Sequence, residues 1–447
     1  MPTRNVMIIS AAMLLSIICY RQIPQNQYAR FYERATKALG EHYVHEVDQQ
    51  QLFRGAMTGR MATLDEHSNY LPPRQFEGLD AILNQEFGGL GIQIESLENS
   101  TELRIITPVL GSPAMEAGLQ AGDIIVKIGE KFTRNMPQDD SLNLLRGAEG
   151  TSVQLSIRRN DDPTLLEFNI TRKIVRTRTL RGFQREVDGR WNYRLPAPND
   201  NFLYLHVTDF GQRTTQEVKQ VLDSANGKWE YDGIVLDLRG NGGGLLLSAV
   251  SICDLFMDQA KVVEVQYRDE NRNVTYSSDV STTRDATTPM VVLIDRDSAS
   301  ASEITAACLQ DHERAIVIGE RSYGKGSVQD VVVLNTSGDN HAIKYTVAHY
   351  VRPSGRNIHR TKSIEQMLPE EDWGVQPNDG YTHTLDEEQR IAYLKDKRER
   401  FIIQPPASKE DSSGNPEVTT IEFEEDDTVF VDLHLQRAIE YLQSRKL

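Results

Sequence analysis

The sequence contains few cysteines and no recognisable metal-binding motif. Its 447 residues include only Cys19, Cys253 and Cys308, and neither a CxxC pair nor an HExxH motif occurs. Cys253 and Cys308 lie in apolar segments typical of helices, so buried free thiols are favoured over a disulfide. Neither a structural zinc site nor a zincin site has support in this sequence, and we predict no metal and no other cofactor.

Positive charge is also scarce. Lys and Arg number 49 against 65 Asp and Glu, and the formal net charge is −16. Binding to a phosphate backbone needs clustered Lys and Arg, so nucleic acid is excluded as a partner. The length is sufficient for two or three domains with a sizeable buried core.

One uncharged apolar run stands at the N-terminus, where residues 6–20 lie between Arg4 and Arg21. It is shorter than the roughly 20 residues of a full membrane span, but its length is normal for a signal peptide. The bulky end at residues 17–20 matches neither a cleavage site nor a lipoprotein signal. We therefore expect residues 1–24 to form a signal-anchor, with a cleaved signal peptide or a buried helix as alternatives. Either export reading places the body outside the cytoplasm, on the periplasmic side of the inner membrane.

The next two segments differ in pattern. Apolar residues at helix-like spacing predict an N-terminal helical segment over residues 25–80, in which Pro72 and Pro73 are expected to end the helix. Residues 86–175 have β character. Strands are predicted at 88–94, 103–106, 122–129 and 153–157, with short helices at 113–119 and 141–145.

The order of elements in residues 86–175 resembles a PDZ domain. Gly89, Leu90, Gly91 and Ile92 match the loop whose backbone N–H groups bind a C-terminal carboxylate while the peptide adds as a strand. Leu142 and Leu145 are expected to complete the pocket for an apolar C-terminal residue. The alternative is a small β domain that only packs against its neighbours.

From residue 176 to 380 apolar strands alternate with helices, which implies an α/β layer architecture. The strands are predicted at 202–207, 233–238, 289–294 and 315–318. Three helices are predicted: one that opens at the Thr214-x-x-Glu217 capping box, one at 245–257 and one at 302–310. Residues 381–447 are predicted to be a polar C-terminal extension. Its first part, 381–420, suits an exposed linker, and its end suits an amphipathic helix.

The most informative stretch alternates serine with alanine over residues 298–302. Ser300 lies between a predicted strand and a predicted helix, where backbone N–H groups are free to donate. The Ala301 N–H would therefore face the oxyanion formed when the Ser300 hydroxyl attacks a carbonyl. Taken alone, the Ser300-x-x-Glu303 spacing also fits a helix cap.

Lys325 follows 25 residues after Ser300, between Gly324 and Gly326. A lysine acts as a base near neutral pH only if desolvation lowers its pKa to about 7 or 8. The flanking glycines allow close approach of other backbone, and Gln329 is placed to hydrogen-bond the amine. A surface lysine in a β-turn is the alternative.

A second glycine cluster follows the strand that ends near Asp237. Consecutive glycines such as Gly243 and Gly244 present backbone N–H groups without obstruction, as an oxyanion hole requires. A tight strand-to-helix turn would need the same glycines.

Together these motifs resemble the carboxy-terminal processing proteases, also called tail-specific proteases. The resemblance covers about residues 30–380 and includes Leu64-Asp65-x-His67-Ser68. It implies an α/β protease core with a mixed sheet and helices, crotonase/ClpP-like, that carries an inserted β-rich PDZ domain. It further implies a serine endopeptidase without metal. Its motif positions make Ser300 the nucleophile, Lys325 the base and Gln329 the orienting residue, with oxyanion donors at Ala301 and at Gly243 or Gly244.

The resemblance also implies partners. Substrate proteins would be recognised through their C-termini by the PDZ domain, which would also gate the site, and the anchor would bind the membrane. Assembly into a homo-oligomer is left open. The sequence departs from the family at Glu66, where a proline is usual, at Gly240-Asn241, and in a polar hairpin added at residues 181–200.

Two rival interpretations use the same lysine. Gly319-x4-Gly324-Lys325 nearly spells a phosphate-binding loop, but Gly326 and an apolar run follow where a hydroxyl and a helix are needed. Ser322-x-x-Lys325 has the spacing of penicillin-recognising enzymes, which need a helical turn that the glycines oppose. A third alternative is an anchored PDZ binding module with an inactive core.

Overall fold

The computed structural model describes residues 5, 12–13, 26–96, 102–160, 162, 164–186, 188–225, 229–279, 284–336, 339–360, 372–402 and 430–445. It divides into two units, Met1–Arg74 with Asp330–Thr346, and Gln75–Gln329 with Val347–Leu447, which are described separately. The predicted anchor at residues 6–20 lies outside the described residues apart from 12 and 13. Within the described ranges, no helix has the length and apolar character needed to cross a membrane.

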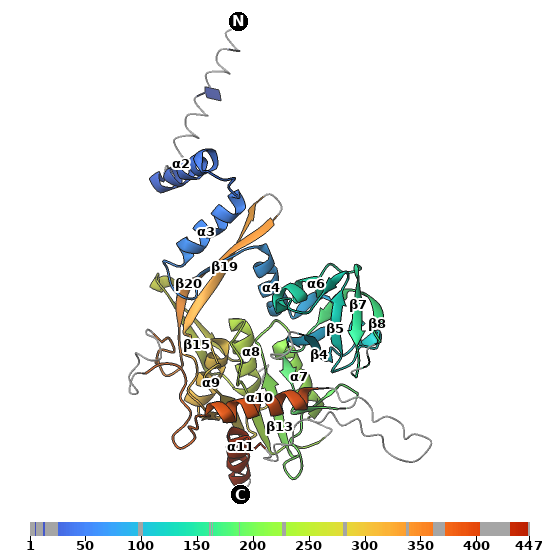
Figure 1. The fold of residues 1–447 in the computed structure, drawn as a ribbon. Coiled ribbons are helices and arrows are strands. Elements are labelled where there is room, and N and C mark those ends of the chain that lie inside the picture. The colour runs from blue at the N-terminus through green and yellow to red at the C-terminus, as the bar shows by residue number, and fades with distance from the viewer. Residues whose placement is uncertain are drawn as a thin grey trace. The chain divides into compact units, whose positions relative to one another are not determined.

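The first unit begins with two capped helices, as the spacing of apolar residues predicts. Helix α2 spans Gln27–His42 and α3 spans Gln49–Met61, and the side chains of Asn26 and Asp48 accept hydrogen bonds at their N-termini. Strand β1, Asn69–Leu71, then pairs antiparallel with residues 342–344 of the long strand β20, Asp339–Val351. β20 also pairs with β19, Ser327–Thr336 (Figure 1).

The proline pair has a role that differs from the one predicted. Pro73 opens helix α4, Pro73–Asn84, rather than closing a preceding helix. Proline is well tolerated in the first helical turn because the N–H that it lacks would have no partner there. The expectation that the pair ends a helix was therefore wrong for Pro73.

Residues 92–171 form the β-rich domain. Its sheet has the order β3-β4-β5-β7-β8, in which β3 is an edge strand, and β6 pairs with β5. The strands are β3 Ile92–Ser96, β4 Leu103–Pro108, β5 Ile124–Ile128, β6 Lys131–Phe132, β7 Ser152–Arg158 and β8 Leu166–Thr171. Helices α5, Pro113–Glu116, and α6, Gln138–Leu145, join them, and the flanking strands β2, Glu86–Gly89, and β9, Lys173–Arg176, pair with each other.

A mixed five-stranded sheet forms the centre of the second unit. Its order is β10-β13-β14-β17-β18, with β10 antiparallel and the other four strands parallel. The strands are β10 Leu180–Arg181, β13 Phe202–Val207, β14 Gly233–Asp237, β17 Met290–Ile294 and β18 Ile316–Gly319. All four predicted apolar strands are thus present. Their residues are buried almost throughout, which explains why the sequence of each strand is a continuous apolar run.

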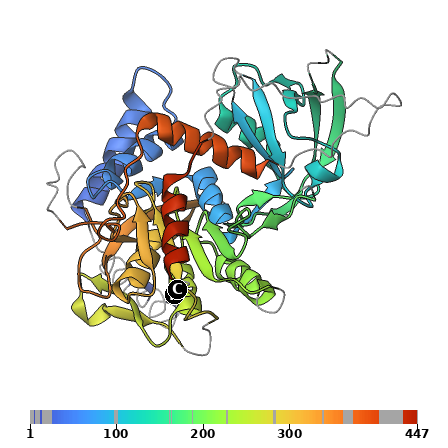
Figure 2. The same cartoon turned by 90° about the horizontal axis from the view of Figure 1, so that it is seen from below.

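Helices cover both faces of this sheet (Figures 1 and 2). On one face Leu205, Leu236 and Val292 pack with helices α7, Thr214–Ala225, α8, Leu246–Phe256, and α9, Ala301–Asp311. Cys253 and Cys308 are buried free thiols in this layer. On the other face Tyr204, Val235 and Leu293 pack with the C-terminal amphipathic helix α11, Leu433–Ser444.

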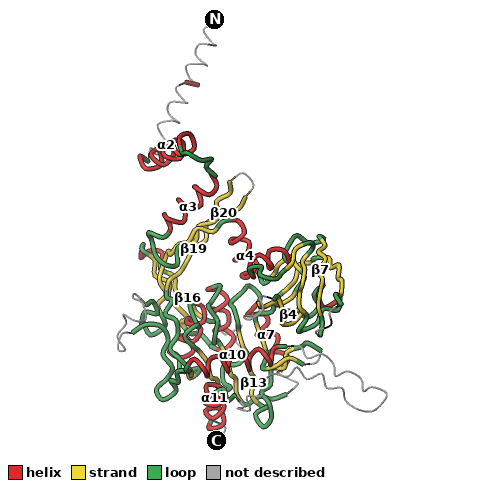
Figure 3. The backbone as a smooth tube through the Cα atoms, in the orientation of Figure 1, coloured by secondary structure: helices red, strands yellow, loops and turns green. Residues whose placement is uncertain are grey.

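Smaller elements complete the second unit (Figure 3). Strand β15, Lys261–Tyr267, pairs with residues 348–351 of β20 and with β16, Val274–Ser277, across the short helix η1, Glu270–Arg272. The predicted hairpin at residues 181–200 is confirmed as β11, Gln184–Arg185, paired with β12, Trp191–Asn192. Its Trp191 is buried against Phe401.

The predicted exposed linker was wrong for its first part. Residues Glu387–Phe401 form helix α10, in which Arg390 and Tyr393 are buried. The polar composition of this segment hides a buried face, on which Arg390 hydrogen-bonds Glu320 at the end of β18. Residues 403–429 lie outside the described part of the chain.

Candidate active site

Ser300 occupies the junction between β17 and α9 and has an unusual backbone conformation. It is the N-cap of α9, its φ and ψ are 55° and −111°, and it is 8% exposed. A positive φ at a residue other than glycine costs on the order of 1–3 kcal/mol and is concentrated at functional sites. The surrounding structure therefore stabilises Ser300 in a strained conformation at the start of a helix.

The three serines of the run have different surroundings. The Ser298 hydroxyl donates to the carbonyl oxygen of Leu238 at 2.9 Å, and the Ser302 hydroxyl donates to that of Asn241 at 2.8 Å. Both side chains thus fasten the serine run to the turn that follows β14. They are fully buried, whereas Ser300 keeps some exposure. Geometry alone therefore separates Ser300 from its neighbours.

Glu303, in the first turn of α9, is fully buried and accepts four hydrogen bonds. Its Oε2 atom accepts from the N–H of Ser300 and of Lys325, each at 2.8 Å. Its Oε1 atom accepts from the Ser322 hydroxyl at 2.6 Å and from the Gly324 N–H at 2.7 Å. The sequence predicted no role for Glu303 beyond that of a helix cap; the signal in the sequence was the Ser-x-x-Glu spacing.

Lys325 lies in a loop that is packed closely on both sides. A methyl group at Gly324 would lie 2.8 Å from the Trp373 ring, and one at Gly326 would lie 2.4 Å from the backbone nitrogen of His359. Gly326 therefore permits the close backbone approach that the sequence predicted, whereas Gly324 leaves room for the side chains of Trp373 and Arg360. The Lys325 side chain is half-buried in this loop.

Gln329 lies four residues beyond Lys325, on β19. Its side-chain amide donates to the Ser327 hydroxyl at 2.8 Å, and Ser327 is buried. This hydrogen bond holds the Gln329 side chain on the strand that leaves the lysine loop.

The glycine turn after β14 is in direct contact with Ser300. A methyl group at Gly243 would lie 2.8 Å from the Cβ of Ser300 and 3.1 Å from the Ala301 nitrogen. Gly243 donates its N–H to the Asn241 side chain at 2.8 Å. Gly244 is instead packed against the Phe210 backbone, with which it forms a bridge. Of the two predicted glycines, the structure thus places Gly243 beside Ser300 and the Ala301 nitrogen, and Gly244 beside Phe210.

Tyr350 is a further neighbour of Ser300 that the sequence did not predict. Its N–H donates to the Gly326 carbonyl oxygen at 2.7 Å, and its side chain lies close enough to the side chain of Ser300 to interact with it. Burial raises the pKa of Tyr350 above its ordinary value, so the phenol is neutral at physiological pH. No motif in the sequence marks this tyrosine.

The two rival uses of Lys325 do not fit the observed backbone. Strand β19 begins at Ser327, where a phosphate-binding loop would require a helix. Residues 321–326 are not helical, so Ser322 and Lys325 do not share a helical turn. Within the described ranges, no group of three or more His, Cys, Asp or Glu side chains could hold a metal ion.

A buried charged cluster lies directly behind the glycine turn. Arg239 is 1% exposed, and its guanidinium donates both to Asp237 and, at 2.8 and 2.9 Å, to Asp432, the N-cap of α11. Burial opposes ionisation of Asp237, but Arg239 holds the pKa of that carboxyl well below its usual range. Helix α11 is thereby attached to the strand that carries the turn.

The predicted peptide-binding residues also lie together. Leu90 and Leu145 belong to the core of the β-rich domain, and Ile92 and Leu142 pack against it. Gly91 has a φ of 76°, and its carbonyl oxygen accepts from Val109 and Ser112, which fixes the loop before edge strand β3.

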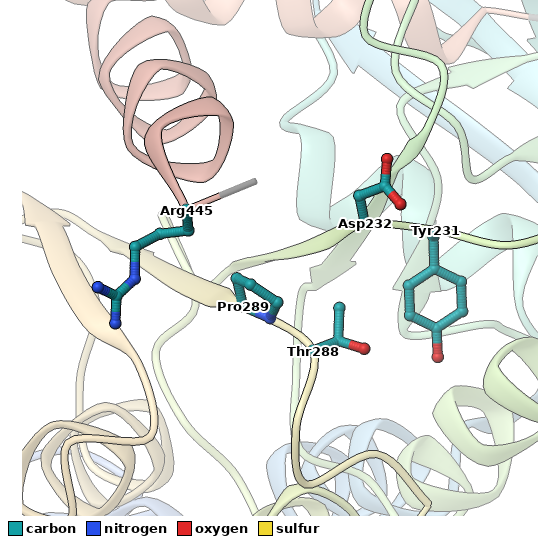
Figure 4. Close-up of a pocket in the computed structure, with 5 residues that line it drawn as sticks. All are labelled: Tyr231, Asp232, Thr288, Pro289 and Arg445. Atoms are coloured by element: carbon teal, nitrogen blue, oxygen red, sulfur yellow. The ribbon is translucent and has the colours of Figure 1, made fainter. Parts of the chain in front are cut away.

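A surface hollow elsewhere in this unit is unrelated to Ser300. It is lined by Tyr231, Asp232, Thr288, Pro289 and Arg445 (Figure 4). Asp232 and Pro289 directly precede β14 and β17, whereas the glycine turn and Ser300 follow these strands. The hollow therefore lies at the opposite edge of the parallel sheet.

Comparison with known proteins identifies the family of this chain. The profile of peptidase family S41 matches residues 201–377, and that of the PDZ domain matches residues 104–159. A carboxy-terminal-processing protease of Bartonella bacilliformis is 33% identical over 83% of this chain and 82% of that protein. Carboxy-terminal processing protease CtpA of Bacillus subtilis is 30% identical over 76% of this chain and 68% of that protein.

A solved structure of the photosystem II D1 C-terminal processing protease is 26% identical, with a TM-score of 0.42. The match covers 84% of this chain and 97% of that one. On the sequence relationships, this chain belongs to the carboxy-terminal processing proteases, serine peptidases of family S41 that carry a PDZ domain.

Proposed function

We propose that this peptidase is a serine endopeptidase with Ser300 as nucleophile, Lys325 as general base and Gln329 as the residue that orients the lysine amine. One observation carries the assignment of Ser300. Of the three serines in the run, Ser298 and Ser302 donate to backbone carbonyls of the glycine turn. Ser300 alone combines partial exposure with a strained backbone beside that turn.

The proposed chemistry follows from this placement. The neutral Lys325 amine removes the proton of the Ser300 hydroxyl as the oxygen attacks the scissile carbonyl carbon. The same proton is then given to the departing amine, and an acyl-enzyme on Ser300 remains. Water, deprotonated by Lys325, attacks the ester and restores the serine.

Backbone N–H groups would stabilise the oxyanion of each tetrahedral intermediate. Ala301 supplies one, because the first N–H groups of a helix have no partner within it. Gly243 or Gly244 supplies the second. The Gly243 N–H already donates to Asn241, which favours Gly244 as the donor and gives Gly243 the role of leaving space beside Ser300.

The PDZ domain would select substrates by their C-termini. Strand β3 is the edge strand of its sheet, so a peptide can add to it by backbone hydrogen bonds. Residues 89–92 would bind the terminal carboxylate, and Leu142 and Leu145 would contact an apolar last residue. Gating of the protease site by this domain belongs to the same proposal.

Ser300→Ala tests the assignment of the nucleophile. We expect the variant to lose at least about 1,000-fold in the rate of cleavage of an unfolded substrate with an apolar C-terminus. Ser302→Ala is the matched control in the same run. Labelling of the wild type with a fluorophosphonate, followed by peptide mass spectrometry, should locate the adduct on Ser300. Full cleavage of the substrate by Ser300→Ala would refute the assignment of Ser300 as the nucleophile. Absence of cleavage by the wild type would favour a PDZ binding module with an inactive core.

For location, we propose that residues 6–20 anchor the chain in the inner membrane and that the peptidase acts on exported or membrane-associated proteins on the periplasmic side. The support is the uncharged apolar run between Arg4 and Arg21. Release of the protein from membranes by alkaline carbonate would contradict the anchor. If an added protease degrades the body of the protein only after the outer membrane is opened, the periplasmic location is supported.

A further inference from the structure

The carboxylate of Glu303 joins two segments that are distant in the sequence. It accepts one hydrogen bond from the backbone of Ser300 and three from the lysine loop, at Ser322, Gly324 and Lys325. The Ser322 hydroxyl is itself fixed, because it accepts from the Val375 N–H at 2.7 Å. Glu303 therefore connects the backbone of the proposed nucleophile directly to the backbone of the proposed base.

This connection acts at the point where the backbone is strained. Ser300 has a positive φ, and its N–H is one of the four donors to Glu303. Lys325 is held through the same oxygen atom, Oε2. A shift of that oxygen would therefore displace both residues, and misplacement by about 1 Å of reacting groups can cost on the order of 100-fold in rate.

The hydrogen-bond pattern favours an ionised carboxylate. Three of the four partners are backbone N–H groups, so a proton on Oε2, or the amide nitrogen of a glutamine at either position, would face at least one of them without an acceptor; a proton on Oε1 would take the place of the hydrogen that the Ser322 hydroxyl donates. Burial raises the pKa of Glu303 above its usual range, while the four hydrogen bonds favour the charged form. The charged form is lost at a higher pH than for an exposed glutamate.

We infer that Glu303 is a positioning residue that sets the distance between the Ser300 hydroxyl and the Lys325 amine, and that it does so only when ionised. The inference rests on the function proposed above. Glu303 does not touch the substrate in this scheme; it acts through the two residues that do.

The variant Glu303→Gln tests the inference, with Glu320→Gln as the matched control. Glu320 is also buried and follows β18, but its carboxylate accepts from Arg390 and the Leu385 N–H, not from Ser300 or Lys325. We expect Glu303→Gln to lower kcat about 100-fold with KM changed less than about 3-fold. Glu320→Gln should retain kcat at a temperature where both variants are folded.

The pH profile provides the readout that a purely structural role would not change. In the wild type, activity at low pH is lost through protonation of both Glu303 and Lys325, so the logarithm of kcat falls with a slope approaching two. In Glu303→Gln only Lys325 is left to titrate, so the slope of the logarithm of kcat against pH should fall to one. An unchanged slope and an unchanged kcat would overturn the inference.

Fluorophosphonate labelling separates this inference from the proposed function. Absence of an adduct on Ser300 in the wild type would refute the proposed function itself. Labelling of Glu303→Gln at the wild-type rate would refute only the positioning role. If Glu303→Gln does not fold, Ser322→Ala removes a single donor and should lower kcat about 3- to 10-fold, whereas wild-type kcat in that variant would contradict the inference.

Discussion

At the scale of single residues, two adjacent glycines in the turn after β14 have opposite surroundings. A methyl group at Gly242 would meet no atom within 4 Å, whereas one at Gly243 would lie 2.8 Å from Cβ of Ser300 and 2.9 Å from the Ala299 carbonyl oxygen. Gly243 also has a φ of 108°, a region that residues with side chains rarely adopt. The two positions therefore form a natural matched pair.

We predict that Gly243→Ala lowers kcat by at least about 100-fold. The added methyl group would lie too close to Ser300, so the Ser300 side chain would have to move from its position beside the Ala301 N–H. Gly242→Ala should stay within about 3-fold of the wild type. The measurements are kcat for an unfolded substrate and the rate of fluorophosphonate labelling. Equal activity of the two variants would show that contact between Gly243 and Ser300 does not matter to the reaction.

The residue scale also shows what a sequence can reveal about a site. The positions of Ser300 and Lys325 were predictable because both lie in short motifs of small residues. Glu303 was not predicted as a site residue, because Ser-x-x-Glu has the same spacing as a helix cap, and its three bonds to residues 322–325 depend on how β18 follows α9. Tyr350 has no local signal at all, since its contact with Ser300 depends on the pairing of distant strands.

At the scale of elements, α10 shows how polar composition misleads. Its Arg390 donates two hydrogen bonds of 2.9 Å to Glu320, and its Lys397 lies near Asp237, Arg239 and Asp295. A segment with so many charges was predicted to be an exposed linker. Arg390 and Lys397 instead interact with charges at the ends of buried strands. These strands were predicted correctly because they are continuous apolar runs.

The capping box at Thr214 illustrates the same limit. Helix α7 begins at Thr214 as predicted, but the Glu217 carboxylate accepts from the N–H groups of Leu180, on β10, and of Thr179 just before it. The local pattern located the start of the helix. The partner of Glu217 is set by tertiary packing, which no local pattern contains.

Lys397 gives a prediction for the stability of α10. Burial lowers its pKa to about 8, although the charges of Asp237 and Asp295 oppose this shift. Below about pH 8 the lysine is charged in both the folded and the unfolded state, and the folded state carries the cost of burying the charge. Between about pH 8 and pH 10.4 the unfolded state holds more protons, so stability rises with pH across that window.

We therefore expect Lys397→Met to stabilise the protein at pH 7 by about 1–3 kcal/mol and to have no effect above about pH 10.4. Lys395→Met, at an exposed position of the same helix, is the control and should change stability little at either pH. Denaturant midpoints measured at the two pH values decide the matter. A destabilised Lys397→Met at pH 7 would mean that attraction to Asp237 and Asp295 exceeds the cost of burial.

At the scale of the second unit, the proposed site lies at the carboxyl ends of three neighbouring strands of one sheet. The glycine turn follows β14, the serine run follows β17, and the loop to Lys325 follows β18, and these three strands are parallel neighbours. The carboxyl ends of parallel strands are the usual place for active sites in α/β sheets. Ser298, Ser302 and Glu303 then fasten the three loops to one another by hydrogen bonds.

The PDZ domain is a separate part of the proposed function and predicts a dependence on the chemistry of the substrate's end. Backbone N–H groups of residues 89–92 would hydrogen-bond a C-terminal carboxylate, and hydrogen bonds to a charged group contribute about 1.5–3 kcal/mol. We expect a substrate with a C-terminal amide to show a KM raised by about 10- to 100-fold relative to the same substrate with a free carboxylate. The scissile bond is the same in both, so kcat should be similar for the two substrates. Leu142→Asp should raise KM only for the carboxylate substrate, and equal KM values for the two substrates in the wild type would contradict recognition of the C-terminus by this domain.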